Sequence, residues 1–257
     1  MRASSTNCAM SPGAEPDRFL GGALRLHQPP RGAHRAGTDA ALLAHLLAVP
    51  DGALACDVGA ATGAVGLGLA RLNPGARVML VERARDLAAL AQRNIDENGF
   101  GDRAWVVAAD VLAPGAARRA AGLEPNRADV VVTNPPFFDG SRERSSPVPA
   151  KASAHTFATG GLDAWIRTCT DLLRPGGAFG MIHRADALPA CLDALRGRFG
   201  AIRVRPVHAR AERPAIRLLV TARKGSRAAL SLLPPLVLQD GDGRFTPEAE
   251  ALHRAPA

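Results

Sequence analysis

Short apolar runs alternate with amphipathic segments along most of the chain. The runs are rich in valine, leucine and alanine, and they lie at 53–58, 76–82, 104–110 and 128–133. Runs of this length, bounded by turn residues, are typical of buried strands. Several of the segments between them space their apolar residues as one face of a helix does. Strands that alternate with helices predict a parallel sheet with right-handed crossovers.

Helix boundaries and apolar faces follow from the same pattern. Thr38 is the expected N-cap of a helix before the first strand, and Asn98-Gly99 is the expected end of the helix after the second strand. Further helices are expected at 161–173 and 186–198. In the helix before the first strand, the expected apolar face consists of Leu42, Leu43, Leu46 and Leu47. In the helix after the second strand, it consists of Leu87, Leu90, Ala91 and Ile95.

The last third of the chain departs from this alternation. After a strand at 178–183, two apolar runs at 201–208 and 215–223 follow each other without a helix between them, so one of them is expected to be antiparallel. The segment 230–253 predicts a short strand or hairpin and a terminal helix. We therefore predict an α/β fold with an open, doubly wound, mostly parallel sheet and a C-terminal antiparallel strand.

Length and composition exclude several classes of protein. No apolar run approaches the roughly 20 residues of a membrane-spanning helix, and the N-terminus lacks a signal-peptide pattern. With no repeat and no linker in 257 residues, we expect a single domain at 19–257 after a flexible tail at 1–18. We also expect a reduced, cytoplasmic monomer that binds no membrane and no metal. The residues without metal-ligand spacing are Cys8, Cys56, Cys169, Cys191, His34, His45, His183 and His208.

The formal net charge of +8 favours a polyanionic partner such as nucleic acid. However, Lys151 and Lys224 are the only lysines, tyrosine is absent and alanine is abundant. This composition indicates a coding bias towards alanine, arginine, glycine and proline, which raises the isoelectric point without any function. The charge alone therefore leaves nucleic-acid binding open.

The turn after the first predicted strand has the composition of a nucleotide-binding loop. It reads DVGAATGAVG, in which Gly59 permits a tight turn and Gly63 permits close approach of a ligand or a helix. Asp57 precedes this turn, Glu82 ends the second strand and Asp110 ends the third. Carboxylates at such strand ends suit the ribose hydroxyls and the amino group of an adenine. Each feature alone also fits a packing or helix-capping role.

The same residues discriminate among nucleotide-like ligands. The chain lacks the G-x-x-x-x-G-K-[ST] signature of a P-loop and the G-x-G-x-x-G pattern of a dinucleotide site. A site rich in carboxylates favours a ligand with ribose, adenine and a positive centre. S-adenosylmethionine, whose sulfonium is cationic, fits this description and is the expected cofactor.

The fourth predicted strand ends in Asn134-Pro135-Pro136-Phe137, which no sheet can continue. An exocyclic aryl amine or a carboxamide is a poor nucleophile because its lone pair is delocalised. The Asn134 side-chain oxygen and the Pro135 carbonyl can each accept one N–H of such a group, and the prolines hold these acceptors rigid. Phe137 offers a face for stacking a planar base or amide. The alternative is that the prolines end a strand and the phenylalanines fill the core.

These motifs, in this order, resemble the class I S-adenosylmethionine-dependent methyltransferases that carry a [DNS]-P-P-[FYW] motif. GAHRAGTDAALLA before the first strand and RPGGAFGMIHRADALPACLDALRGRFG after the motif resemble the bacterial family that methylates the N6 amine of an anticodon-loop adenine in valine tRNA. The resemblance covers residues 19–250 and implies a Rossmann-like class I fold, with Thr38 in the cofactor site. The commonest cofactor loop of these enzymes has a further glycine where this chain has Ala61.

An anticodon-loop adenine of tRNA is the expected substrate, and RNA the expected partner. The alternatives are a release-factor glutamine, a ribosomal-RNA guanine, or a cofactor-binding protein that has lost turnover. The net charge and the lack of a large N-terminal substrate domain favour RNA over a release factor. The polar stretch 139–158 is either an RNA-binding loop or a solvated one. Its basic residues are Arg142, Arg144, Lys151 and His155, and those of the C-terminal third are Arg203, Arg205, Arg210, Arg213, Arg217, Arg223, Lys224 and Arg227.

Overall fold

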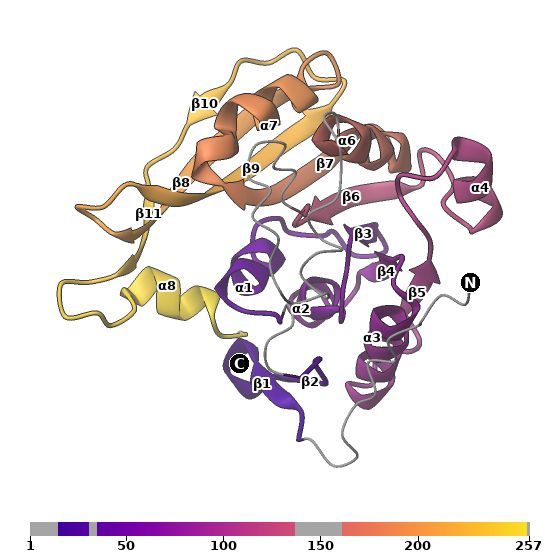
Figure 1. Ribbon diagram of the computed structural model, residues 1–257, viewed down its shortest axis with the longest axis horizontal. Helices are drawn as coiled ribbons and strands as arrows, with labels where there is room; N and C mark the ends of the chain where they lie inside the picture. Colours follow the sequence, from indigo (N-terminus) through magenta and orange to yellow (C-terminus); the bar gives the residue numbers. More distant parts are fainter. Residues whose placement is uncertain (1–14, 31–34, 137–160, 256–257) are drawn as a thin grey trace, which may run out of the picture.

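The computed structural model describes residues 15–30, 35–136 and 161–255, which are built around a nine-stranded sheet (Figure 1). The strand order is β10-β8-β9-β7-β6-β3-β4-β5, with β11 beside β8. Five neighbouring strands are parallel, namely β3 (Leu54–Val58), β4 (Arg77–Glu82), β5 (Ala104–Ala108), β6 (Ala128–Thr133) and β7 (Leu173–Arg184). The predicted parallel sheet is therefore confirmed.

The predicted C-terminal antiparallel strand is β9 (Ala215–Lys224), which pairs antiparallel with both β7 and β8 (Phe199–Arg210). The tail adds β10 (Ser231–Leu232) and β11 (Leu236–Gln239), both parallel to β8, and ends in α8 (Pro247–Leu252). Because β9 reverses direction and β8 reverses it again, β8 runs towards the same edge of the sheet as β6 and β7.

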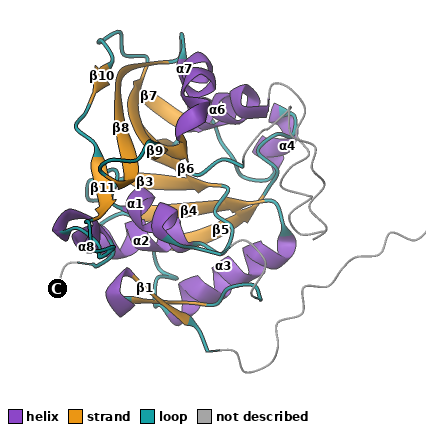
Figure 2. Ribbon diagram, turned by 60° about the vertical axis from the view of Figure 1, so that its left-hand side comes forward, coloured by secondary structure: helices purple, strands orange, loops and turns teal. Residues whose placement is uncertain are grey.

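Helices cover both faces of the sheet, as a doubly wound fold requires (Figure 2). One face carries α1 (Thr38–Ala44), α2 (Ala64–Leu72) and α3 (Arg85–Glu97), and the other carries α4 (Gly115–Ala120), α6 (Gly161–Leu172) and α7 (Leu188–Leu195). A short 3-10 helix, η2 (Ala185–Ala187), precedes α7.

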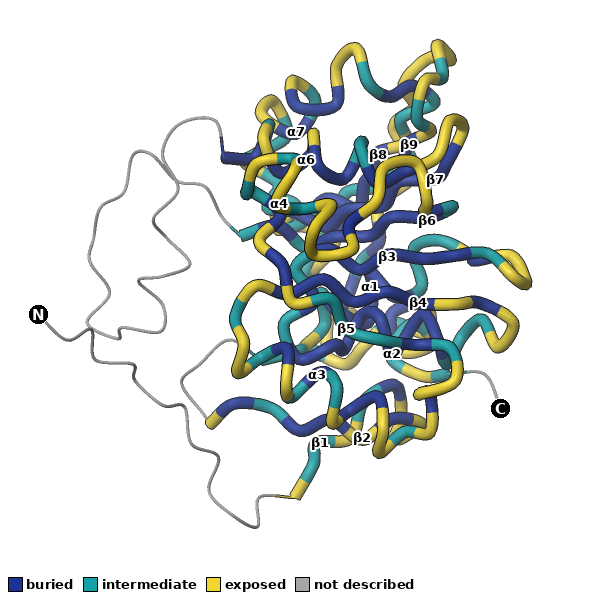
Figure 3. The backbone as a smooth tube through the Cα atoms, turned by 90° about the vertical axis from the view of Figure 1, so that its right-hand side faces the viewer, coloured by how far each residue is buried: buried dark blue, intermediate teal, exposed yellow. Residues whose placement is uncertain are grey.

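Each face of the sheet has its own apolar core. Leu42, Leu67 and Ile95 belong to the core beneath α1, α2 and α3, whereas Ile166 and Phe179 belong to the core beneath α6 and α7. Figure 3 shows the result, with the buried strands at the centre and the exposed connections around them. The sheet is thus a rigid support for the loops that leave its edge.

An N-terminal hairpin precedes the sheet. It consists of β1 (Asp17–Phe19), η1 (Leu20–Gly22) and β2 (Leu24–Leu26), with β1 and β2 antiparallel. The hairpin includes Asp17 and Arg18, which the sequence placed in the tail, whereas residues 1–14 lie outside the described residues. The boundary between tail and domain therefore stays a prediction.

Two helices differ from their predicted form. The N-cap of α1 is Gly37 and not Thr38, because Thr38 is already helical and its hydroxyl lies 3.3 Å from Nε2 of His253. The helix also ends at Ala44, before the last leucines of the expected face. In α3, the expected Leu87 and Leu90 are only half-buried. The buried face consists of Ala88, Ala91, Asn94 and Ile95.

Ala91 of α3 packs against the loop before α2. A Cβ on Gly63, in the loop before α2, would lie 3.4 Å from Cβ of Ala91. A leucine at this position of α3 would therefore collide with the loop. Close approach of the loop thus requires a small residue at position 91.

The predicted turn at 174–177 lies inside β7 as a bulge. The pairing with β6 passes from Ala128 opposite Leu173 to Val130 opposite Ala178, so the extra residues loop out. The helix expected at 186–198 is shorter, since η2 replaces its first turn and Gly197 beyond its end has a φ of 74°.

The described cysteines, Cys56, Cys169 and Cys191, are free and buried. Burial raises the pKa of all three thiols, so they are poor nucleophiles. Among the helices of the described ranges, none is long and apolar enough to cross a membrane.

Candidate active site

The candidate site lies where the parallel strands end. Val58, the last residue of β3, pairs with Val81 on one side and with Thr133 on the other. Gly59 follows the last residue of β3, and Asn134 follows the last residue of β6. Because those last residues are paired, the chain leaves the two neighbouring strands at the same height along the sheet. The predicted cofactor loop and the predicted Asn-Pro-Pro motif are therefore adjacent.

The loop after β3 folds tightly back onto β4. The N–H groups of Gly59 and Ala60 both donate to the Val81 carbonyl at 2.9 Å. Gly59, Ala61 and Gly63 all have positive φ, at 79°, 48° and 87°. Left-handed residues in alternation turn backbone N–H groups towards one side, as in anion-binding nests.

Ala61 explains why glycine is common at its position. Its φ of 48° places a Cβ in the left-handed region, which costs roughly 1–2 kcal/mol for a residue other than glycine. Gly63 has less freedom, because a Cβ there would lie 2.8 Å from Cδ2 of Leu80. The loop thus tolerates a side chain at 61 at the cost of backbone strain, and excludes one at 63.

Glu82 connects this loop to the end of β4. Its Oε2 accepts the N–H of Ala61 at 2.9 Å, and its Oε1 accepts the N–H of Ala84 at 2.7 Å. The residue is 9% exposed. A carboxylate oxygen can accept more than one hydrogen bond, so both oxygens retain capacity for hydroxyl donors.

Asp57 is buried beneath the loop, with 2% exposure. Its Oδ2 accepts the N–H of Gly66 in the first turn of α2 at 2.8 Å. Burial raises the pKa of Asp57 to about 7, the hydrogen bond from Gly66 opposes this rise, and the nearby charge of Glu82 adds to it. Asp57 therefore holds α2 against β3.

Asp110 and Thr38 lie at the margins of the predicted cofactor site. Asp110 comes two residues after β5 rather than at its last residue, and it is exposed. Its Oδ1 accepts the N–H of Leu112 at 2.9 Å. Thr38 begins α1, whose Asp39 accepts a hydrogen bond from Arg217 of β9 at 2.9 Å. Among the described contacts, neither residue has a hydrogen bond to the loop after β3.

The acceptor motif continues directly from β6. Asn134 and Pro136 are half-buried and Pro135 is buried. Phe137, predicted as a stacking face, lies outside the described residues, as does the polar stretch 139–158. The described part of the motif thus consists of an amide and two prolines at the carboxyl end of β6.

The sequence did not indicate two residues behind this motif. Nε1 of Trp165, in α6, donates to Oγ1 of Thr133 at 2.9 Å, and this hydroxyl donates to the Val58 carbonyl at 2.8 Å. The signals available were the position of Thr133 just before Asn134 and the scarcity of tryptophan in the chain.

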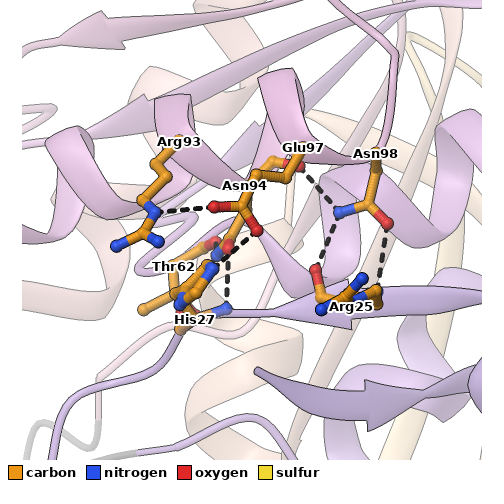
Figure 4. Close-up of polar contacts among 7 residues, drawn as sticks. All are labelled: Arg25, His27, Thr62, Arg93, Asn94, Glu97 and Asn98. Atoms are coloured by element: carbon orange, nitrogen blue, oxygen red, sulfur yellow. Dashed lines mark hydrogen bonds and ion pairs between the residues drawn. The ribbon is translucent and has the colours of Figure 1, made fainter. Parts of the chain in front are cut away.

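Asn94 is a third such residue, on the other side of the loop (Figure 4). Its side-chain N–H groups donate to the carbonyls of Thr62 at 2.9 Å and His27 at 3.0 Å, and its Oδ1 accepts the N–H of His27 at 2.7 Å. One turn later, Asn98 makes the same pair of contacts with the backbone of Arg25. α3 thereby fastens both the N-terminal hairpin and the cofactor loop.

In the ranges that the structure covers, no group of three histidine, cysteine or acidic residues is arranged to hold a metal ion. The acids of the site are instead engaged with backbone N–H groups.

Comparisons with known proteins agree with this arrangement. The sequence profile of the family described as methyltransferase small domain matches residues 33–206. A tRNA1(Val) (adenine(37)-N6)-methyltransferase of Dickeya chrysanthemi is 29% identical over 232 residues, which cover 87% of this chain and 88% of that protein. A release factor glutamine methyltransferase of Moorella thermoacetica is 29% identical over 146 residues, or 54% of this chain and 49% of that one. The crystal structure of a predicted O-methyltransferase from Agrobacterium tumefaciens is 32% identical, with a TM-score of 0.71 over 85% of this chain and 98% of that chain.

Proposed function

Because the chain belongs to the methyltransferase small domain family, we propose that it methylates the exocyclic N6 amine of an adenine in a tRNA anticodon loop, with S-adenosylmethionine as donor. The observation that carries this proposal is the pairing of Val58 with Thr133, since it sets the cofactor loop beside Asn134. A donor loop and an amine-binding motif that follow paired residues of neighbouring strands suit direct transfer between two bound molecules.

The donor side fits S-adenosylmethionine chemically. Glu82 has acceptor capacity for ribose hydroxyls, and Asp110 is an exposed acceptor at the next strand. Gly59 and Gly63 allow the loop to turn tightly against β4, which lets a ligand approach its backbone. We assign the cofactor to these residues, with Asp57 and Thr38 supporting the loop and α1. When bound, the cofactor supplies an electrophilic methyl group on a cationic sulfur.

The acceptor side fits an amine whose lone pair is delocalised. The side-chain oxygen of Asn134 and the carbonyl of Pro135 accept the two N–H bonds of the amine and direct its lone pair towards the methyl group. Pro135 and Pro136 stiffen the backbone, so these acceptors are in place before reaction. Phe137 is proposed to stack against the base.

Removal of the proton from the methylated amine does not require a strong base in the protein. Methylation produces an ammonium-like nitrogen that loses its proton readily, so no strong base has to act before the attack. The released proton passes to solvent, and the contributions of this chain are alignment of the amine and fixed acceptors for its N–H bonds.

Two observations favour RNA over a protein substrate. The similarity to the Dickeya chrysanthemi tRNA methyltransferase extends over most of both chains, whereas that to the release factor methyltransferase covers about half. In addition, Arg210 and Arg213 lie at the turn between β8 and β9, on the same sheet edge as Asn134. Arg205 and Arg217 contribute less charge, since they pair with Glu248 and Asp39.

The test is a labelling experiment with separate acceptors. The protein is incubated with tritiated S-adenosylmethionine and either total tRNA, ribosomal RNA or release factors. Label in tRNA supports the proposal, and its incorporation should fall steeply with salt because phosphate contacts release counterions. Label only in ribosomal RNA or only in a release factor would show that this acceptor, and not tRNA, is the substrate. No label in any acceptor would indicate a cofactor-binding protein without turnover.

A further inference from the structure

Trp165 lies against both halves of the candidate active site. A Cβ added to Gly59 would lie 2.8 Å from Cζ2 of the indole, so the ring packs directly on the backbone of the cofactor loop. The indole nitrogen reaches the other half, because it donates to Oγ1 of Thr133 at 2.9 Å. Trp165 is 7% exposed, so both contacts are shielded from water.

Thr133 completes the connection. Its hydroxyl is buried, accepts from Trp165 and donates to the carbonyl of Val58 at 2.8 Å. The hydrogen bonds therefore join the last residue of β3, the last residue of β6 and α6 at one point. The residues that follow this point in the two strands are Gly59 and Asn134.

A packing role alone does not account for this arrangement. The apolar core beneath α6 already includes Trp165, and a phenylalanine would fill much of the same space. A phenylalanine lacks the outer ring atoms that pack on Gly59, and it lacks the N–H, which here donates to the hydroxyl that links β3 and β6. A buried indole N–H needs such a partner.

We propose that Trp165 is a positioning residue that sets the distance between the cofactor loop and Asn134 through Thr133. The inference rests on the proposed function, in which the amine held at Asn134 must meet a methyl group held by the loop. Displacement of reacting groups by about 1 Å can lower a rate by about a hundredfold, so a link at this point affects turnover more than binding.

Three substitutions separate the hydrogen bond from the packing. Trp165→Phe keeps an aromatic ring but removes both the N–H and the ring atoms that pack on Gly59. Thr133→Val keeps the shape and removes only the hydroxyl, and Thr133→Ser keeps the hydroxyl. The matched control is Trp105→Phe, which changes the other tryptophan, on β5 beneath Arg77.

The first readout is methyl transfer to tRNA under saturating cofactor. Trp165→Phe and Thr133→Val should each lower kcat roughly tenfold, while Thr133→Ser and Trp105→Phe stay close to the parent chain. The dissociation constant for S-adenosylhomocysteine, measured by calorimetry, should change by much less than kcat. The double variant Trp165→Phe/Thr133→Val should lose little more kcat than Thr133→Val alone, because Thr133→Val already removes both the bond from the indole and the bond to Val58.

The second readout does not depend on turnover. Amide hydrogen exchange should become faster in peptides that contain Gly59 and in those that contain Asn134, in both Trp165→Phe and Thr133→Val but not in Trp105→Phe. Faster exchange confined to α6, or none, would overturn the inference even in a chain that methylates nothing. A parent chain without methyl transfer would overturn only the proposed function.

Discussion

The two sides of the candidate site are held by different kinds of contact. On the donor side, the carboxylates of Asp57 and Glu82 accept backbone N–H groups from α2, from the loop and from the start of α3. On the acceptor side, Thr133 to Pro136 carry no ionisable side chain, and a hydroxyl and an indole hold the strand end. The donor side is therefore sensitive to charge and pH, whereas the acceptor side depends on geometry.

This difference predicts that substitutions divide by side. Changes on the donor side should alter stability and cofactor affinity, and changes on the acceptor side should alter turnover. An acceptor-side variant that alters cofactor affinity, or a donor-side variant that alters only turnover, would show that the two sides are energetically coupled.

The largest effect is expected for Asn134→Ala. Loss of one fixed hydrogen-bonding partner of the transition state commonly lowers kcat by about 100- to 1000-fold. Cofactor affinity should stay within about threefold, because in the proposed function Asn134 contacts the amine and not the donor. Single-turnover kinetics and calorimetry measure the two quantities. Gln92→Ala, which removes an amide from the exposed side of α3, is the control, and equal turnover in both variants would refute the role of Asn134.

Asp57→Asn should change the pH dependence of stability. The folded-state pKa of about 7 lies above the value of 3.8 for a free carboxyl, so the folded chain retains a proton that the unfolded chain has lost between these limits. The free energy of unfolding of the parent chain should therefore be highest below pH 4 and fall as pH rises through 7, as far as this group determines it.

In the Asp57→Asn variant this part of the pH dependence should be absent. Its stability relative to the parent chain should rise by a few kcal/mol between acidic and neutral pH, since one pKa unit corresponds to about 1.4 kcal/mol. Urea unfolding at several pH values measures the difference. Parallel curves for the two proteins would show that Asp57 titrates normally.

Glu82→Ala should weaken cofactor binding by about tenfold or more, as expected for loss of a hydrogen bond to a charged group. The substitution also leaves the N–H groups of Ala61 and Ala84 without their carboxylate, so the loop should loosen. Turnover at saturating cofactor should fall by much less than affinity. Calorimetry tests this against Glu124→Ala, an exposed acid outside the site. Equal affinities would remove Glu82 from the cofactor site.

The smallest effect is expected for Ala61→Gly. Glycine relieves the left-handed strain at this position, and the free energy of unfolding should rise by about 1 kcal/mol. Ala201 has a similar φ of 49° in β8, so Ala201→Gly should stabilise the chain similarly. Only Ala61→Gly should alter cofactor affinity. An unchanged or lowered stability in both variants would mean that neither position is strained.

Much of this architecture follows from local sequence. Apolar runs bounded by turn residues predicted the core strands, and β6 has the predicted bounds because its valines are buried between two neighbours. The loop glycines and Glu82 were predictable because tight turns and strand-end acids have a direct physical meaning. The two strands without an intervening helix likewise predicted the antiparallel pairing of β9.

Other features depend on contacts between distant segments. Trp165 and Thr133 are 32 residues apart in the sequence, and Asn94 and His27 are 67 residues apart. No local sequence pattern therefore predicts either contact. The buried face of α3 was misjudged in part because it includes Asn94, a polar residue whose side chain is hydrogen-bonded to the backbone of Thr62 and His27. The N-terminal hairpin was missed because its strands are only three residues long.

The most direct test of the central claim is the identity of the methylated atom. The protein is incubated with tRNA and a donor that carries a deuterated methyl group, and the digested nucleosides are analysed by mass spectrometry. The account predicts deuterated N6-methyladenosine from the anticodon loop with the parent chain and almost none with Asn134→Ala. Label on a ribose oxygen or on guanine, or equal N6-methyladenosine from both proteins, would contradict it.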